Sequence, residues 1–211
     1  MWLETLRGVI MVEMATNPLE AFATERLLIR APREGDGPEI NAAILDTWDD
    51  LHATMPWART RLSVQDSEDH SREARREFLE RRDLQLRAYL EGTGTFVVGS
   101  GLHRLDWTVP SAEIGYWCRA QFQRQGYVSE AVRAIAAFGF EKLGMERIAI
   151  HCDERNARSR MVAERVGFVF EGVLRNEARD PSGGLRNTLV FSLTPEEFRT
   201  KSEGRWSPRY L

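Results

Sequence analysis

Two short segments contain residue types whose spacing could support chemistry. The first is Gln123-Arg124-Gln125-Gly126-Tyr127-Val128, which lies between a stretch typical of a strand and a stretch typical of a helix. The first N–H groups of a helix have no partner within it, and the helix dipole places partial positive charge there, so such a start suits a phosphate group. Gly126 would let the backbone approach that group closely, and Arg124 would add positive charge. The segment predicts a pyrophosphate site, and the alternative is an ordinary polar loop.

The second segment, residues 156–168, is predicted to be a helix that Asn156 caps. At helical spacing one face carries Ser159, Val162 and Ala163, while the charged residues of the segment point away from that face. Ser159 would therefore present its hydroxyl to the interior. This hydroxyl could contact a reacting group, or it could bond to a carbonyl one turn back along the helix.

The two segments, in this order, resemble the motifs of the GNAT acetyltransferases. Tyr116-Trp117 followed by Gln123-x-x-Gly126-x-Val128 is similar to the family's phosphate-binding motif, Gln/Arg-x-x-Gly-x-Gly/Ala. The match departs at Val128, where the family has glycine or alanine. A β-branched residue resists a positive φ, so Val128 suits this position only if its backbone is helical there.

The second segment also resembles a GNAT motif, Asn-x-x-(Ala/Ser)…Gly-Phe, through Asn156, Ser159, Gly167 and Phe168. Many members carry a catalytic tyrosine seven residues after the asparagine, and this chain has Ala163 there. Ser159 is instead typical of the RimJ/RimL-like branch, the ribosomal-protein N-terminal acetyltransferases and their relatives. Two further segments resemble that branch, Met55-Pro56-Trp57 and Glu113-Ile114-Gly115-Tyr116-Trp117.

The resemblance implies an enzyme that uses acetyl-coenzyme A as cosubstrate and no metal, with direct attack of an amine in a ternary complex. Ser159 would bond to, or protonate, the departing coenzyme A sulfur. Glu113, just before the loop, is the leading candidate for the base that accepts the amine proton, and His151 and Asp153 are alternatives. The family's strands splay apart here, which would free backbone N–H groups for the thioester carbonyl. The residues expected to contact the cosubstrate are Trp117, Cys118, Gln123, Arg124, Gln125, Gly126, Tyr127, Val128, Ser129, Asn156 and Ser159.

The acceptor is expected to lie against the helical segment from Ile40 to Trp57 and the turn near Arg179-Asp180. Trp48, His52 and Trp57 could line its pocket, or they could pack as core. The resemblance favours a protein N-terminus, and the alternative is a small amine such as an amino acid, a polyamine or an aminoglycoside. A non-catalytic module that binds acyl-coenzyme A is a second class of function.

Nucleic-acid binding through residues 72–87 is a third class. The mixed charges of the predicted helix at 68–82 are more typical of a solvated helix face, and the chain's formal net charge of −3 provides no basic excess. Nucleic acid is therefore an unlikely partner. A covalent acetyl-cysteine route is disfavoured because no base is evidently paired with Cys118 or Cys152.

The elements that must position these residues follow from hydrophobic periodicity and turn signals. Strands are predicted at 26–30, 84–90, 95–102, 113–118 and 147–152, from 168 onward and at 189–193. Helices are predicted from 38 to a break at Pro56, at 68–82, at 129–143 and from 156 to before Gly167. The predicted fold is α+β, a GNAT fold with a single mostly antiparallel, splayed sheet flanked by helices. The domain is predicted at 24–198, with an N-terminal extension at 1–23 and a C-terminal tail at 199–211.

The composition fits one globular domain, with 211 residues of which 42% are hydrophobic and 29% charged. Two cysteines are too few for a disulfide framework and show no metal-site spacing, so both are expected to be reduced thiols. No apolar run is long enough to span a membrane, and no signal peptide is evident. We therefore expect a cytoplasmic protein, and the resemblance implies a possible homodimer.

Overall fold

The computed structural model describes residues 19–203 and 206–211. Nine strands form a single sheet in the order β7-β8-β6-β5-β4-β3-β2-β1-β9. Every neighbouring pair is antiparallel except β5 and β6, which are parallel. The strands are β1 (Ala21–Ala23), β2 (Leu27–Arg30), β3 (Leu84–Leu90), β4 (Phe96–Asp106), β5 (Ser111–Cys118), β6 (Arg147–Asp153), β7 (Val169–Arg179), β8 (Leu185–Leu193) and β9 (Arg209–Tyr210). This confirms the predicted α+β fold with a mostly antiparallel sheet.

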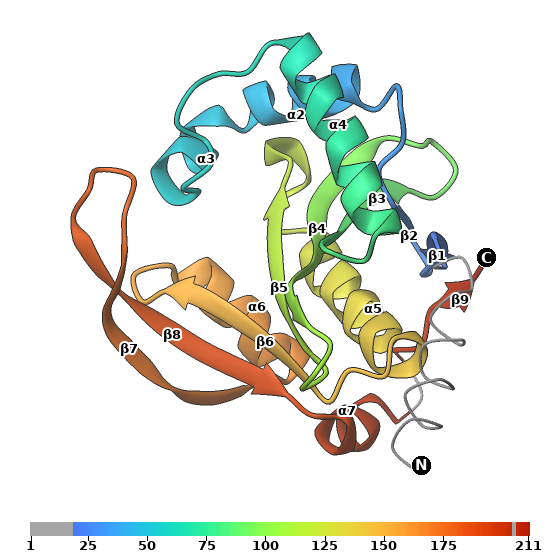
Figure 1. The fold of residues 1–211 in the computed structure, drawn as a ribbon, viewed down its shortest axis with the longest axis vertical. Coiled ribbons are helices and arrows are strands. Elements are labelled where there is room, and N and C mark those ends of the chain that lie inside the picture. The colour runs from blue at the N-terminus through green and yellow to red at the C-terminus, as the bar shows by residue number, and fades with distance from the viewer. Residues whose placement is uncertain (1–18, 204–205) are drawn as a thin grey trace, which may run out of the picture.

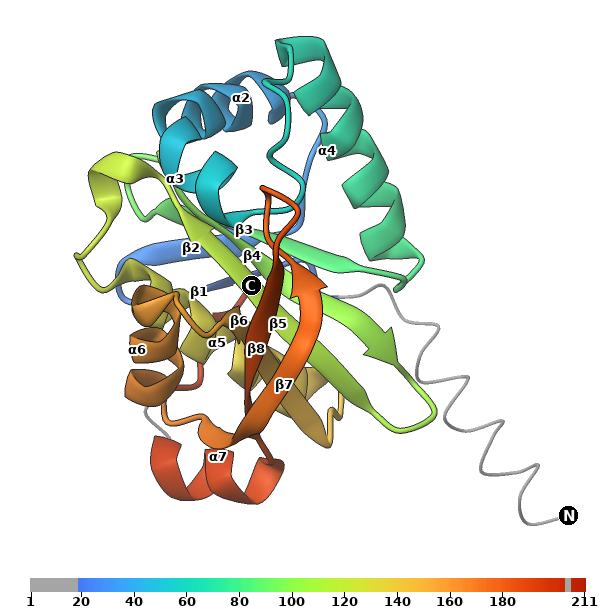
Figure 2. The same ribbon diagram turned by 90° about the vertical axis from the view of Figure 1, so that its left-hand side faces the viewer.

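Helices cover both sides of the sheet. They are α2 (Gly37–Asp46), α3 (Trp48–Thr54), α4 (Val64–Leu79), α5 (Tyr127–Lys142), α6 (Ala157–Val166) and α7 (Pro195–Ser202), with a 3₁₀ turn, η1, at Ala120–Phe122. Helices α2, α3 and α4 lie on one side of β2, β3 and β4, and α5 lies on the other (Figures 1 and 2). The main core forms where α5 packs on the sheet, and its largest buried side chains include Phe22, Phe138 and Ile114. No helix within 19–203 or 206–211 is long and apolar enough to cross a bilayer.

The helix predicted from residue 38 to Pro56 is two helices, because the chain bends at Thr47. The Thr47 hydroxyl donates to the Ala43 carbonyl at 2.8 Å and accepts from the Ala120 N–H at 2.9 Å. A threonine hydroxyl that bonds to the backbone one turn back bends a helix, and here it also reaches another segment. The bend sets α3 apart from α2 and ties its start to the turn that leads to the predicted phosphate loop.

The charged helix begins at Val64, before the predicted start at Glu68. Ser63 and Asp66 form a reciprocal capping box, which satisfies backbone donors at the helix start. Arg72, Arg76 and Arg82 all form ion pairs with carboxylates, as expected of a solvated face with paired charges.

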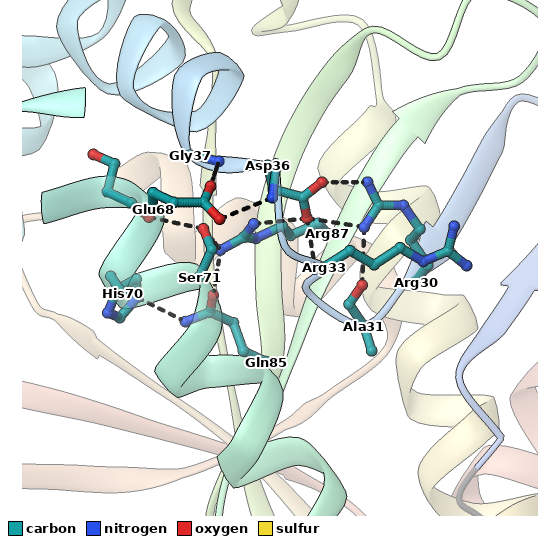
Figure 3. A network of polar contacts seen from close by, with 12 residues as sticks. Arg30, Ala31, Arg33, Asp36, Gly37, Glu68, His70, Ser71, Gln85 and Arg87 are labelled. Carbon is teal, nitrogen blue, oxygen red and sulfur yellow. Dashed lines mark hydrogen bonds and ion pairs between the residues drawn. The ribbon is translucent and has the colours of Figure 1, made fainter. Parts of the chain in front are cut away.

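The same region contributes a buried polar network that holds the helices on the sheet (Figure 3). Asp36 binds Arg30 at 2.7 Å and Arg87 at 2.8 Å, and the Arg87 side chain is only 3% exposed. Glu68 accepts from the N–H groups of Gly35 and Gly37 and so caps the start of α2. The interpretation of the predicted helix at 68–82 as a solvated face is therefore wrong for Glu68, whose partners lie on a distant segment that periodicity does not reveal.

The sheet extends past both predicted domain boundaries. Ala21–Ala23, predicted to lie in the extension, pairs with β2 and with β9, and β9 lies in the predicted tail. Phe22 is fully buried and stacks on Phe138 of α5 at 5.2 Å. Both segments are therefore part of the folded unit. The remainder of the predicted extension, 1–18, lies outside the described residues.

Candidate active site

A gap between two parallel strands lies at the centre of the candidate site. β5 and β6 pair only where Ser111, Ala112 and Glu113 face residues 147–149. Beyond this pairing β5 stays bound to β4 as far as Cys118, and β6 stays bound to β8 as far as Asp153. The strands separate toward α3, as Figure 1 shows. The backbone edges that face the gap, including the one near Trp117 and Cys118, thus have no strand partner across it, and the expected splay is confirmed.

The predicted phosphate loop connects η1 to the first turn of α5. Gly126 is the N-cap of α5 with φ +85°, a left-handed conformation that glycine adopts at little cost, and Arg124 is also left-handed at φ +62°. Tyr127, Val128 and Ser129 form the first turn of the helix, so their N–H groups point out of its start. Val128 has no positive φ, so the β-branched side chain fits the helical backbone at this position.

Arg26, in the turn between β1 and β2, fixes this helix start. Its guanidinium donates to Glu130 at 2.6 Å and to the Gln125 carbonyl at 3.2 Å, and it lies 4.4 Å from the centre of the Tyr127 ring. Arg26 is not evident from the sequence as part of this site, because it lies about a hundred residues before the loop and no local pattern links the two.

The Gln123 side chain points toward α3. Its amide donates to Asp50 at 2.9 Å, and Arg158 at the start of α6 binds the same Asp50 oxygen at 3.2 Å. The hydrogen bond from Gln123 is the largest influence that lowers the pKa of Asp50, followed by the charge of Arg158. The side chain of Gln123 therefore connects the loop to α3. Any contact between Gln123 and the cosubstrate would be made by the backbone of Gln123.

Ser159 and Tyr116 meet from opposite sides of the gap. Asn156 caps α6 as predicted, accepting from the Ser159 N–H at 3.0 Å. The Tyr116 hydroxyl of β5 lies 2.8 Å from the Ser159 hydroxyl and donates to the Ser159 carbonyl at 3.1 Å. Burial raises the pKa of Tyr116, which therefore keeps its proton. The alternative in which the Ser159 hydroxyl bonds one turn back does not describe this geometry.

Tyr116 lies within the family motif, but its sequence position alone does not indicate a role in the site. Ala163, at the position of the family tyrosine, is fully buried. A different tyrosine, from a strand, thus reaches the serine of α6. The only local signal is that Tyr116 falls on the same face of β5 as the buried residues Ala112 and Ile114.

Glu113 lies on the opposite face of β5, at the narrow end of the gap. Its carboxylate is 3.1 Å from His151 Nδ1 and 3.0 Å from Arg104. Burial alone would raise the pKa of Glu113, but the hydrogen bond and charge of His151 and the charge of Arg104 lower it overall. Two of the three predicted base candidates are thus in contact. Asp153, the third, binds Arg155 at 2.7 Å, and this hydrogen bond is the main cause of its lowered pKa.

The two cysteines are free thiols. Burial raises the pKa of Cys118 to about 12, and burial also raises the pKa of Cys152, which lies beside Ser159. A thiol with a raised pKa is a poor nucleophile, which argues against a covalent acetyl-cysteine route. No group of three or more metal-ligating side chains occurs in the described part of the chain.

The three residues predicted to bind the acceptor do not line one common cavity. His52 lines a cavity of about 370 Å³ between α3 and the β7–β8 turn. Trp48 stacks on His52 at 5.3 Å but lines a second cavity of about 330 Å³ beside Ala120. Trp57 is half exposed and lies 6.3 Å from Trp117, whose indole packs against Phe96. Only His52 therefore borders the turn near residues 179–180 where the acceptor is expected.

Comparison with known proteins identifies the family. Residues 26–169 match the acetyltransferase (GNAT) domain. The chain is 36% identical over 73 residues to the ribosomal-protein-serine acetyltransferase of Escherichia coli, which covers 35% of this chain and 41% of that protein. It is 35% identical over 115 residues to the uncharacterized N-acetyltransferase YoaA of Bacillus subtilis. This match covers 54% of this chain and 59% of YoaA. The matched part of the chain thus spans about half the length of these curated relatives.

The fold has close counterparts among solved structures. RimL, a ribosomal L7/L12 α-N-protein acetyltransferase in complex with coenzyme A, superposes with a TM-score of 0.76. The superposition covers 83% of this chain and 98% of RimL at 19% identity, so it bears on the fold alone. Because the GNAT domain spans more than half of the chain and the architecture agrees, the chain belongs to the GNAT acetyltransferase family.

Proposed function

We propose that the protein transfers the acetyl group of acetyl-coenzyme A directly to a primary amine, the N-terminal α-amino group of a protein. The observation that carries this proposal is the gap between β5 and β6, which has the hydroxyl groups of Tyr116 and Ser159 on one face of the sheet and the carboxylate–imidazole pair of Glu113 and His151 on the other. Acetyl transfer to an amine needs a proton donor for the departing sulfur and a proton acceptor for the amine, placed on either side of the thioester.

The loop and the first turn of α5 would hold the pyrophosphate of the cosubstrate. The left-handed backbone at Arg124 and Gly126 and the unpaired N–H groups at the helix start suit an anion, and Arg124 adds positive charge. Asn156 and Ser159 at the start of α6 would contact the pantetheine arm. Backbone N–H groups of β5 near Trp117 and Cys118 would stabilise the charge that grows on the thioester carbonyl.

On the side of α6, Ser159 would donate a proton or a hydrogen bond to the departing sulfur. Tyr116, at 2.8 Å, would orient the serine hydroxyl as a positioning residue. A tyrosine whose pKa is raised by burial remains a donor near neutral pH. Its single proton could turn from the Ser159 carbonyl to the serine oxygen, which would leave the serine proton free.

On the opposite face, Glu113 and His151 would accept the amine proton. Their 3.1 Å contact lets either group take the proton and share it with the other. Asp153 is the weaker candidate, because Arg155 already binds its carboxylate.

A protein N-terminus is the preferred acceptor because named relatives include a ribosomal-protein-serine acetyltransferase. The contact between Tyr116 and Ser159 supports catalysis over a silent acyl-coenzyme A-binding module. A cytoplasmic location and a dimeric state remain predictions from the sequence.

The test is to incubate the protein with acetyl-coenzyme A and a panel of peptides and small amines while following free thiol. We expect thiol release that depends on a peptide α-amino group, with one acetyl group gained per thiol. Release only with small amines would overturn the acceptor assignment. Binding of acetyl-coenzyme A without release for any amine would support the non-catalytic alternative.

A further inference from the structure

The cavity of about 370 Å³ beside His52 has two walls. One wall is the end of α3 with the chain after it, including Ala58 and Arg59. The other wall is the β7–β8 turn, including Arg179 and Asp180. In both ribbon views the tip of the β7–β8 hairpin lies next to α3 (Figures 1 and 2).

Each wall is fastened to the proposed active site. On α3, Asp50 binds Gln123 of the phosphate loop and Arg158 of α6. On the turn, Asp180 binds Arg155 at 3.2 Å, and Arg155 also binds Asp153 at the end of β6. These contacts connect the walls of the cavity to the end of β6 and the start of α6, where the gap between β5 and β6 is open.

The cavity carries positive charge that no carboxylate neutralises. Arg59 bonds to the Pro56 carbonyl at 3.2 Å and Arg179 to the Gly183 carbonyl at 2.7 Å, and neither arginine forms an ion pair with any described residue. Both side chains are exposed, one on each wall.

The only carboxylate that lines the cavity is occupied. Asp180 Oδ1 accepts from the Ser182 hydroxyl at 2.6 Å and the Gly184 N–H at 2.9 Å, while Oδ2 accepts from Arg155. Glu177, also near this end of β7, does not line the cavity and accepts the Thr188 hydroxyl at 2.8 Å. The cavity is thus suited to an anion from outside.

We propose that this cavity receives an acidic side chain of the acceptor, so that the substrates are proteins with Asp or Glu close to the acetylated N-terminus. The inference deepens the proposed function and rests on it.

A carboxylate suits the cavity better than a phosphate does. The guanidinium groups of Arg59 and Arg179 are planar donors that match carboxylates, and they come from opposite walls. The N–H groups of Gly183 and Gly184 already donate to the Asp180 carbonyl and carboxylate, so neither glycine N–H is available to a phosphate. Exposed cations of this kind would also steer an acidic peptide toward the site.

The test compares peptides of one length with the same first residue, followed by either acidic residues or their amides. Wild-type protein should show a KM for the acidic peptide about tenfold below that for the amide peptide, as expected of two charge contacts formed at an exposed site. Arg59→Gln and Arg179→Gln should each raise the KM for the acidic peptide about three- to fivefold, with kcat unchanged, because the contact is the same in ground and transition states.

The matched control is Arg165→Gln, which removes the same charge from an exposed arginine in the last turn of α6 and should change nothing. Equal KM values for the two peptides in the wild type would overturn the inference. So would an acidic preference that survives the double variant, or a preference for a phosphorylated peptide or a free acidic amino acid. Absence of thiol release with every amine would instead refute the proposed function, so the two failures are distinguishable.

Discussion

The proposed proton donor gives the sharpest prediction. Ser159→Ala removes a hydroxyl that lies 2.8 Å from the Tyr116 hydroxyl. Tyr116 keeps the Ser159 carbonyl as an acceptor at 3.1 Å, so no buried polar group loses its last partner. The free energy of unfolding should therefore fall by only about 1 kcal/mol. The main effect of Ser159→Ala should therefore be a lower kcat.

General acid catalysis contributes roughly 10²- to 10⁴-fold to a rate. Tyr116 remains beside the vacated position and retains its proton, so the expected loss extends from the lower part of this range down to about tenfold. We predict that kcat falls roughly ten- to a thousandfold, about 1.4 to 4 kcal/mol in activation free energy. Tyr116→Phe, which removes the contacts with the Ser159 hydroxyl and carbonyl but leaves the serine in place, should lower kcat about tenfold.

The assay is single-turnover thiol release at saturating acetyl-coenzyme A, which separates the chemical step from binding. Ser207→Ala is the matched control, since the Ser207 hydroxyl bonds to Glu141 away from the gap and its removal should leave kcat unchanged. Unchanged turnover of Ser159→Ala on the physiological acceptor would refute the assignment, and so would a loss seen only in the KM for acetyl-coenzyme A.

Three further predictions test the loop, the base and the buried network. Gly126→Ala forces a side chain onto a backbone at φ +85°, so the Kd for acetyl-coenzyme A should rise about tenfold. The control is Gly144→Ala, which changes a glycine that is also left-handed, at φ +67°, but lies past the other end of α5. It should lower the stability of the fold and leave the Kd unchanged. Glu113→Gln should lower kcat/KM roughly a hundredfold. His151 and Arg104 lower the pKa of Glu113 despite its burial. The acid limb of the wild-type pH–rate profile should therefore lie below the ordinary glutamate pKa of about 4.3. Asp36→Asn should destabilise the fold by about 3–5 kcal/mol in chemical denaturation, because Arg87 is left buried without its carboxylate.

The pH dependence of the free energy of unfolding provides an independent test of the role of Asp36. Burial would raise the pKa of Asp36, but hydrogen bonds from Arg30 and the Arg33 N–H and the charges of Arg30 and Arg87 lower it overall. A group with a lowered folded-state pKa stabilises the protein above its unfolded pKa, and this contribution is lost as the pH falls through the folded value. Wild-type stability should thus decline below about pH 4, and Asp36→Asn should flatten that decline. If the stability of Asp36→Asn declined at acid pH as steeply as that of the wild type, the role of Asp36 would be contradicted. If Glu113→Gln retained the kcat/KM of the wild type, the role of Glu113 as a base would be contradicted.

Local chemistry made part of the site predictable. Asn156 as a cap, Gly126 at the helix start and the inward face of Ser159 each depend on residues within one or two turns. Such signals are contained in the sequence because helix caps and periodicity act over short separations.

The partners of these residues were not predictable in the same way. Tyr116 and Ser159 are 43 residues apart, Gln123 and Asp50 are 73 apart, and Arg26 reaches Glu130 across 104 residues. Each contact depends on where the sheet places a strand or a turn, which no single segment encodes.

The same limit applies to the fold. The bend at Thr47 depends on the Ala120 N–H from a distant turn, so the segment alone reads as one helix. β1 and β9 are too short to show a hydrophobic period. They are strands because β1 pairs with both β2 and β9.

A crystal structure with coenzyme A bound would test the central claim most directly. We predict that the pyrophosphate lies against the N–H groups at the start of α5, that the pantetheine enters the gap between β5 and β6, and that the sulfur lies within hydrogen-bonding distance of the Ser159 hydroxyl. Coenzyme A bound elsewhere, or a sulfur directed away from both Ser159 and the Glu113–His151 pair, would contradict the account.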